Sequence, residues 1–384
     1  MTKSMVLITG ATGNLGSRVL VRFLQDPMIS FKLLVYARSR EEAEASVQKS
    51  IEFWGASWAD SRSRIEIVLG DITREDLGLE RGVREALTKE VTHIIHCAAN
   101  FKLNLPLIEA RKSIVFGTQY LVELGEECRG NGQFRRFNYI STEEVGVALA
   151  GKVPEDFIPL RPQSGYFNTY EYAKAEAEDF LHTKVTQDSF PVTVYRPAII
   201  VGDSETGKII NAQGFYYLIR DMFLRPSSPF IPVNDLFQVD VIPVDFLANA
   251  LYLMYDAPET AGHVYNMSAG RNRFLTLREL LKALQDIHFD MTGKRITLKP
   301  FISPRPIFLV LSWLSHMTWG ALRETLAFQL DFLRFFFVTA SFETASLDGF
   351  LRERGIQTPA LKEYLPVLYQ YYYENDLKLA SLQK

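Results

Sequence analysis

A glycine-rich turn close to the start of the chain constrains the fold most strongly. Residues 9–16, TGATGNLG, follow the apolar run 5–8 and precede residues 18–24, in which apolar side chains recur at helical spacing. Glycine has no Cβ, so a turn of this kind lets backbone N–H groups and the positive end of the helix approach a pyrophosphate. The order strand, glycine turn, helix therefore predicts a dinucleotide-binding unit. The contacts expected from this turn are Gly10, Thr12, Gly13, Asn14, Leu15 and Gly16.

Apolar runs of strand length alternate with helical patterns through the first half of the chain. The strands are expected at 5–9, 32–37, 64–69, 93–97, 137–141 and 191–196. Such alternation is typical of a parallel sheet with crossover helices. Two helix starts agree with it, because Glu42 follows Ser39, and Glu279 follows Thr276, at capping-box spacing. The chain is therefore predicted to be an α/β protein with a Rossmann-type doubly wound parallel sheet.

A change of pattern near residue 203 indicates a second unit. Prolines interrupt an aromatic-rich stretch there, yet sheet-like segments return at 239–243 and 264–267. We therefore expect a smaller C-terminal substrate lobe that is interleaved with the nucleotide domain. The Rossmann domain is assigned to residues 1–202 with sheet-completing segments near 239–256 and 263–268, and the lobe to residues 203–238 and 269–384.

A tyrosine and a lysine four residues apart form the second motif, Tyr170 and Lys174 in YEYAK. Residues 173–181 have a helical pattern, so the two side chains should share a face. An ammonium one turn from a phenol stabilises phenolate, and we expect it to lower the tyrosine pKa from about 10 towards working pH. Such a phenol can protonate a carbonyl that is being reduced. Ser141 or Thr142, at the end of a predicted strand, could hold the same oxygen, and the predicted catalytic set is Thr142, Tyr170 and Lys174.

The second predicted strand ends in Arg38, about 20 residues beyond the glycine turn. An acidic residue at this place would indicate NAD, because it would bond the ribose 2′-hydroxyl. Arginine instead offers a planar set of donors that suits a phosphate, so NADPH is expected, with Arg40 or Lys3 as helpers.

Further cofactor contacts are expected where other strands end. A carboxylate after the third strand could reach the adenine amine, with an apolar side chain against the ring. Small residues after the fourth strand let a dinucleotide lie along the strand ends. These contacts are Asp71, Ile72, Ala98, Ala99, Pro197 and Ile199.

Composition excludes several classes of protein. The net charge of −3 carries no long run of one sign, so nucleic-acid binding is not indicated. The two cysteines, Cys97 and Cys128, are too few for a disulfide framework, which favours a reducing cytoplasm. The chain enters its first strand by residue 5, so no secretory leader is expected. No metal is expected, because only His93 and His96 lie close together and they flank an apolar strand.

Residues 301–340 are unusually apolar, and 307–322 contain no Asp, Glu, Lys or Arg. A membrane span needs about 20 apolar residues, and this stretch, interrupted by His316, falls short. A buried helix pair is the favoured interpretation. The alternative is an amphiphilic lid over an acyl tunnel, with weak contact to a membrane surface.

Several segments together resemble extended short-chain dehydrogenase/reductases. They are TGATGNLG, GDI, HCAA, YISTEEVG, YEYAK and residues 195–207, YRPAIIVGDSETG. The last one resembles above all the fatty acyl-CoA reductases and carrier-protein thioester reductases of the male-sterility type. The resemblance implies that NADPH reduces the thioester of an acyl-CoA or acyl-carrier protein to the aldehyde, with Tyr170 as proton donor, Lys174 on the ribose and Thr142 orienting the carbonyl. It leaves open the acyl chain, the carrier, further reduction to the alcohol, and the oligomeric state.

The chain departs from this family at two places. Ser113 stands where the family often has asparagine, so a proton relay is not expected there. Glu143 and Glu144 resemble the STDEV segment of nucleotide-sugar dehydratases, in which acidic residues do acid–base chemistry. A solvated pair at the start of a loop is the other interpretation.

Two other classes of function compete with thioester reduction. One is an oxidoreductase, epimerase or dehydratase that acts on a sterol-like alcohol or ketone or on a nucleotide sugar. Residues 203–235 are mostly aromatic and aliphatic, which disfavours a sugar. The other is a protein that senses NADPH without turnover, which has no need for Tyr170 and Lys174. With no adenylation or carrier segment ahead of the glycine turn, an activated acyl group is expected from another protein.

Overall fold

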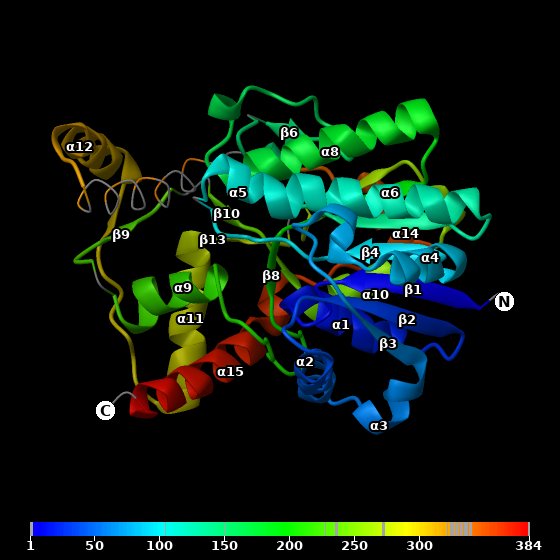
Figure 1. Cartoon of the computed structure of the whole chain (residues 1–384). Helices are drawn as coiled ribbons and strands as arrows, with labels where there is room; N and C mark the ends of the chain where they lie inside the picture. Colours follow the sequence, from blue (N-terminus) through cyan, green and yellow to red (C-terminus); the bar gives the residue numbers. More distant parts are fainter. Residues whose placement is uncertain are drawn as a thin grey trace.

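A parallel sheet with helices on both faces forms the centre of the structure, which is a computed structural model (Figure 1). A lobe of helices and short strands lies beyond the carboxyl ends of the strands. The residues described are 3–103, 105–149, 151–226, 228–234, 237–270, 273–320, 322, 326, 330, 333, 337 and 340–382, with side chains as far as 375.

The central sheet has seven strands within the described residues, all parallel, in the order β12-β7-β5-β4-β1-β2-β3. Their bounds are β1 Ser4–Thr9, β2 Ile29–Val35, β3 Ile65–Leu69, β4 His93–His96, β5 Arg136–Ile140, β7 Val192–Pro197 and β12 Val264–Met267. The chain runs from β1 out to β3 and returns to β4 on the other side of β1. Open α/β sheets bind ligands at such a reversal. The six predicted strands are confirmed, and the doubly wound α/β fold with them.

Two apolar cores hold the helices against the sheet. One core lies under α1 Asn14–Phe23, α2 Arg40–Phe53, α10 Val244–Met254 and α14 Ala345–Arg352. The other lies under α4 Arg81–Glu90, α5 Leu107–Arg111, α6 Gly117–Gly130 and α8 Thr169–Asp188. Figure 1 shows α6 and α8 above the sheet and α1 and α10 below it. Shorter helical segments are α3 Trp58–Ser61, η1 Arg62–Arg64, η2 Glu75–Gly78, η3 Lys112–Phe116, α7 Glu144–Val147, η4 Gln163–Gly165 and η6 Pro258–Thr260.

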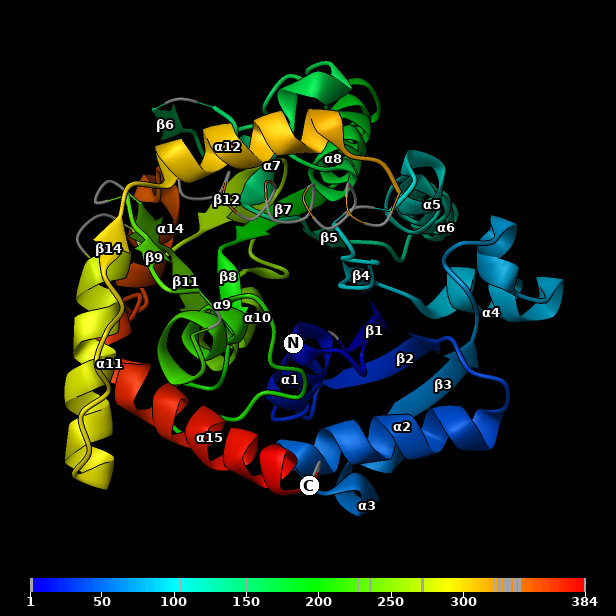
Figure 2. The ribbon, with the colours of Figure 1, turned by 90° about the vertical axis from the view of Figure 1, so that its left-hand side faces the viewer.

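The lobe has a third apolar core of its own. Its helices are α9 Phe215–Ile219, η5 Arg220–Leu224, α11 Leu277–Thr292, α12 Pro304–Met317 and α15 Leu361–Leu382. The small strands pair as β8 Ile199–Val201 with β11 Val241–Pro243, β9 Ile231–Pro232 with β14 Phe301–Ile302, β10 Gln238–Val239 with β13 Leu275–Thr276, and β6 Lys152–Val153 with β15 Ser341–Phe342. Helix α11 begins with the predicted capping box of Thr276 and Glu279. Figure 2 views the molecule from the side of this lobe.

Two segments lie differently from the predicted division of the chain. Strand β12 joins the central sheet, but β11 pairs with β8, so only one of the two segments expected to complete the sheet does so. Residues 341–352, assigned to the lobe, pack instead on the nucleotide domain through Leu347 and Phe350 of α14. Amphipathic spacing identifies such a helix but not the core that it joins.

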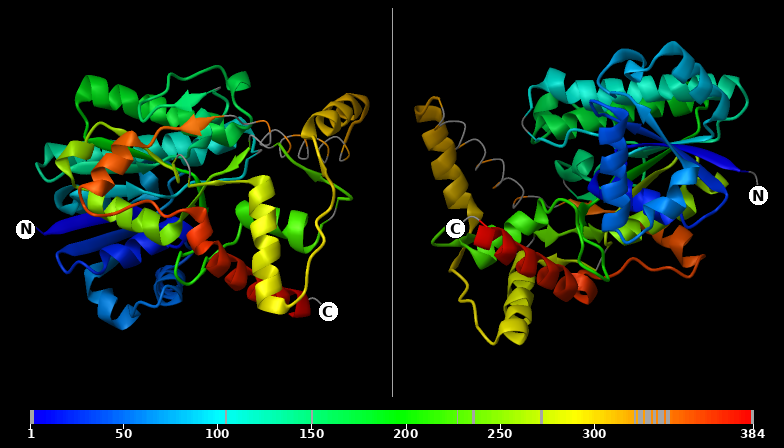
Figure 3. Two further views of the ribbon diagram at one scale, coloured as in Figure 1. Left: turned by 180° about the vertical axis from the view of Figure 1, so that it is seen from behind. Right: turned by 60° about the horizontal axis from the view of Figure 1, so that its bottom comes forward.

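The helix α12 packs on the lobe core through Ile307, Phe308 and Leu311 but exposes its other face, so the interpretation of this part of 301–340 as a buried helix is wrong for that face. Leu309 is 68% exposed, Trp313 61% and Trp319, just beyond the helix, 83%. Figure 3 shows α12 standing away from the sheet. Much of the second half of the predicted pair lies outside the described residues. The contact of 301–340 with a membrane surface stays a prediction, and no helix in the described part of the chain is long and apolar enough to span a membrane.

Candidate cofactor and active site

A cavity of about 1760 Å³ lies at the carboxyl ends of the central strands, between the sheet and the lobe. Its wall includes the glycine turn, the strand ends and the predicted catalytic residues. The predicted site residues that line it are Gly10, Thr12, Gly13, Asn14, Leu15, Gly16, Asp71, Ile72, Ala98, Ala99, Thr142, Tyr170, Lys174, Pro197 and Ile199. The structure therefore brings together residues that are up to 189 positions apart in the sequence.

The glycine turn is packed so closely that it leaves no room for a side chain at Gly10 or Gly16. Gly10 has a φ of +72°, and a Cβ there would lie 2.9 Å from the backbone nitrogen of Ala98. A Cβ on Gly16 would lie 2.2 Å from the Gly10 carbonyl oxygen. The turn leads directly into α1, which begins at Asn14. This geometry fits a pyrophosphate held by backbone N–H groups at a helix start.

The side chain of Asn14 connects the glycine turn to the lobe. Its Nδ2 donates to the Asn211 carbonyl at 2.9 Å, and the Asn211 backbone N–H donates to its Oδ1 at 2.8 Å. Close by, the Arg18 guanidinium pairs with Asp203 at 3.1 Å. The segment 203–211, part of the motif that suggested the family, thus anchors the lobe to the nucleotide domain.

Arg38 does not line the cavity. It is exposed two residues beyond Tyr36, which does line it and is 82% exposed. The backbone N–H of Arg38 donates to Glu42, whose own backbone N–H donates to Ser39. The arginine therefore lies at the edge of the cavity, where a phosphate at the end of a longer ligand could meet it.

Tyr170 and Lys174 lie one turn apart at the start of α8, whose cap is Asn168. Lys174 is buried, and its Nζ donates to the Ile140 carbonyl at 2.7 Å. Burial lowers the pKa of Lys174 to about 8, and the nearby Glu178 acts in the opposite direction. Burial raises the pKa of Tyr170, and the charges of Glu144 and then Glu171 raise it further. The expectation that this pKa is lowered is therefore wrong for this structure, because burial and two nearby carboxylates favour the neutral phenol.

The hydroxyls of Ser141 and Thr142 have different surroundings. Ser141 Oγ donates to Glu178 Oε1 at 2.5 Å. Glu178 is also the partner of the fully buried Arg196, whose Nη2 lies 2.5 Å from Oε2. Thr142 Oγ1 accepts from the Glu144 backbone N–H at 3.3 Å, and its hydrogen stays available to the cavity. This difference favours Thr142 over Ser141 for contact with a substrate.

Two carboxyl groups follow Thr142 on the cavity wall. Glu143 is only 7% exposed and Glu144 is partly buried, so the interpretation as a solvated pair is wrong. Burial, then the charges of Asp240 and Glu144, raise the pKa of Glu143 well above its usual range. Burial raises the pKa of Glu144 to about 7. Each has a buried Oε2 without a hydrogen-bond partner among the described residues.

Several residues that line the cavity were not predicted from the sequence. Asp240 lies between β10 and β11, accepting from Ser268 and from the Ala269 backbone N–H. Phe342 and Thr344 reach the cavity from the segment between α12 and α14. These residues belong to two-residue strands and loops, which carry no periodic signal. Nothing in their local sequence could have placed them here.

Burial shifts the pKa values of two other titratable side chains near the cavity. Burial lowers the pKa of His96 to about 3, and Thr9 Oγ1 lies 2.7 Å from its Nδ1. Burial raises the pKa of Cys97, which lines the cavity, to about 12. Ser113 lies in the π-helical segment η3 and also lines the cavity. No group of three metal-ligating side chains occurs in the part of the chain that the structure describes.

The reversed parallel sheet, the glycine turn and the Tyr170–Lys174 pair define an extended short-chain dehydrogenase/reductase. The chain belongs to the male sterility protein family of NAD-binding domains, whose model matches residues 8–251.

Known relatives agree with this assignment. A nonribosomal peptide synthetase, asaC of Aspergillus flavus, is 27% identical over 275 residues, which make up 69% of this chain and 26% of that protein. The carboxylic acid reductase of Mycobacterium tuberculosis is 28% identical over 273 residues, 64% of this chain and 23% of that protein. The chain thus spans about a quarter of these relatives. The terminal R domain from the myxalamid PKS-NRPS biosynthetic pathway has the same fold, with a TM-score of 0.78 at 22% identity over 97% of this chain and 90% of that one.

Proposed function

We propose that the protein is an NADPH-dependent reductase that converts an acyl thioester, carried by CoA or a carrier protein, to the aldehyde. The observation that carries the proposal is that Thr142, Tyr170 and Lys174 line the same cavity as the glycine turn. Membership of the family and the relation to a carboxylic acid reductase support it. Both cysteines are free, which suits a reducing compartment such as the cytoplasm.

The residues present fit a bound NADPH, which supplies the hydride. The glycine turn would hold the pyrophosphate through backbone N–H groups at the start of α1, and the absence of a Cβ at Gly10 and Gly16 lets the turn close tightly. Lys174 Nζ uses one N–H on the Ile140 carbonyl and keeps two donors for the ribose hydroxyls. Arg38, at the edge of the cavity, is placed for the 2′-phosphate.

Thr142 and Tyr170 polarise the thioester carbonyl. Their two hydroxyls donate to its oxygen, and negative charge grows on this oxygen as the carbonyl carbon accepts hydride. Tyr170 carries its proton at neutral pH, as a phenol with a pKa of about 10 or above does, and it transfers that proton to the oxygen. The carbon–sulfur bond of the resulting hemithioacetal then breaks as its hydroxyl proton returns to Tyr170. The departing thiolate takes up one proton, which leaves aldehyde and free thiol. The reaction consumes one thioester, one NADPH and one proton.

The lobe supplies the wall for the acyl group. Phe215, Tyr217 and Leu218 of α9 line the cavity, and Phe342 joins them from the segment before α14. Such side chains favour an acyl group over the polar ring of a sugar.

The decisive experiment is to follow NADPH oxidation at 340 nm with matched acyl-CoAs and acyl-carrier proteins and to identify the extracted product. We expect oxidation that depends on the thioester, one thiol released for each aldehyde, and a lower KM for the natural carrier. Alcohol as the product would add a second reduction to the same site. Turnover of alcohols or ketones without turnover of any thioester would overturn the proposal.

A further inference from the structure

The proposed reduction leaves two buried carboxyl groups unused. Glu143 and Glu144 line the cavity next to Thr142, and an oxygen of each is buried without a partner in the described residues. Glu143 is 7% exposed, so little water is available to solvate its charge. An unpaired buried carboxylate is costly, and it is found where a ligand can supply the missing partner.

The charge of the cavity wall does not compensate these groups. Its described residues include two lysines and no arginine or histidine. Lys174 donates to the Ile140 carbonyl, and Lys152 pairs with Glu343 at 3.7 Å. Asp240 adds a third carboxyl group, and its charge raises the pKa of Glu143. Because no arginine or histidine of the described cavity wall stands beside them, a bound cation would stabilise these carboxyl groups in their charged forms.

Two kinds of cation could fill the place. A metal ion is disfavoured, because no group of three suitable ligands occurs among the described residues. An ammonium group fits better, since it carries one positive charge and donates hydrogen bonds to several carboxylate oxygens at once. We propose that Glu143 and Glu144 form a subsite for an ammonium group on the acyl chain, so that the substrate is an amine-bearing acyl thioester. This inference rests on the proposed thioester reduction.

The subsite lies close to the reacting carbonyl. Glu143 follows Thr142 directly, and consecutive Cα atoms are about 3.8 Å apart. The charge of Glu144 is also near enough to Tyr170 to raise the pKa of that phenol. The ammonium group therefore belongs on one of the first few carbon atoms of the acyl group, while the rest of the chain contacts the aromatic wall of α9.

The test compares pairs of pantetheine thioesters in which a methyl group replaces the ammonium group. The pairs are glycyl with propanoyl, 3-aminopropanoyl with butanoyl, and 6-aminohexanoyl with heptanoyl. We expect kcat/KM to favour the amine at least tenfold in one of the two short pairs. The preference should fall to about one in Glu143→Gln and in Glu144→Gln. It should persist in Glu343→Gln, which changes a carboxylate of the same cavity that already has a lysine partner.

The outcomes separate the two proposals. If the wild-type protein reduces the neutral thioesters and does not favour any amine, the ammonium subsite is overturned and the reductase stands. The same conclusion follows if both glutamine variants keep the preference, provided that thermal unfolding shows them to be folded. If no thioester of either kind is reduced, the proposed function fails and the subsite with it.

Discussion

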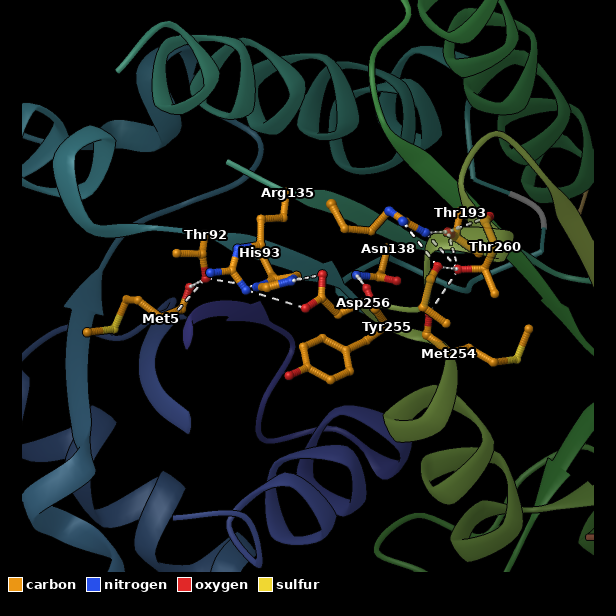
Figure 4. A network of polar contacts seen from close by, with 12 residues as sticks. Met5, Thr92, His93, Arg135, Asn138, Thr193, Met254, Tyr255, Asp256 and Thr260 are labelled. Carbon is orange, nitrogen blue, oxygen red and sulfur yellow. Dashed lines mark hydrogen bonds and ion pairs between the residues drawn. The ribbon is translucent and has the colours of Figure 1, made fainter. Parts of the chain in front are cut away.

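Buried polar networks occur at both ends of the central sheet, but among the described residues the carboxyl groups without partners lie at the carboxyl ends. At the amino ends of the strands, His93 lies 3.0 Å from Asp256, which also pairs with Arg135 at 3.4 Å (Figure 4). Nearer the middle of the sheet, Asn138 donates to the Tyr255 carbonyl, and Tyr195 donates to Asn138. At the carboxyl ends, Glu143 and Glu144 line the cavity, and each has a buried Oε2 without a partner among the described residues.

This difference distinguishes groups that stabilise the fold from groups that are available to a ligand. The network at the amino ends ties β4 and β5 to the end of α10, and paired groups of this kind stabilise a fold. Unpaired groups destabilise it, and they persist where a ligand compensates them. A substitution in the cavity should therefore lower the activity more than the stability. A matched substitution in the paired network should lower the stability more than the activity.

The largest contrast is expected from replacing tyrosine by phenylalanine in the cavity and in the network that includes Asn138. Tyr170→Phe should lower kcat by about 10²- to 10⁴-fold, because it removes the proton donor, and should leave NADPH affinity and the melting temperature nearly unchanged. Tyr195→Phe should keep the activity and lower the free energy of unfolding by about 1–3 kcal/mol, because Asn138 Oδ1 loses its donor. Steady-state kinetics and denaturant unfolding measure both. Equal activity in the two variants would break the comparison.

The sequence predicted one end of the sheet much better than the other. The glycine turn and the Tyr170–Lys174 pair are local motifs, so their residues could be named before their geometry was known. Asp240 and Phe342 reach the cavity from short segments whose place depends on the packing of the lobe. The network around Asp256 was not predicted for the same reason. Its members come from β4, β5 and the end of α10, which only the packing of the fold brings together.

Three interpretations failed because they depend on burial. The spacing of Tyr170 and Lys174 is visible in the sequence, but the desolvation that raises the tyrosine pKa is not. A position at the start of a loop suggested that Glu143 and Glu144 are a solvated pair, whereas both line the cavity at the start of α7. Apolar composition likewise suggested that α12 is buried, although Leu309, Val310 and Trp313 on one of its faces are exposed. Composition and spacing describe a segment, and tertiary packing decides what surrounds it.

A second matched pair replaces glutamate by glutamine. Glu178 is buried with full partners in Arg196 and Ser141, so Glu178→Gln should destabilise the protein by about 3–5 kcal/mol, because it leaves Arg196 buried and unpaired. Glu143→Gln should instead raise the stability at pH 8, because it removes a carboxyl group that must be desolvated. Urea unfolding at pH 8 tests both. Destabilisation by Glu143→Gln would show that this carboxyl group has a structural partner.

The pH dependence of stability should carry the signature of Glu144. Its pKa rises from 4.5 to about 7 on folding, so the native state binds the proton more tightly. Stability should therefore fall as the pH rises from about 4.5 to 7, by about 3 kcal/mol at most, and this contribution should be constant above pH 7. Unfolding curves of wild type and Glu144→Gln across this range isolate the effect. Parallel curves would mean that Glu144 keeps an ordinary pKa.

The smallest contrast concerns two arginines. Arg38 is exposed at the edge of the cavity, whereas Arg135 pairs with Asp256 in the network at the amino ends. Arg38→Ala should lower the preference for NADPH over NADH, measured as a ratio of kcat/KM, by about tenfold, or 1.4 kcal/mol, because the 2′-phosphate loses its partner. Arg135→Ala should cost less than about 1 kcal/mol of stability, because the pair is partly exposed, and should leave the cofactor preference unchanged. If Arg38→Ala kept the full preference, another residue would hold the phosphate, and Arg40 would be the next to replace.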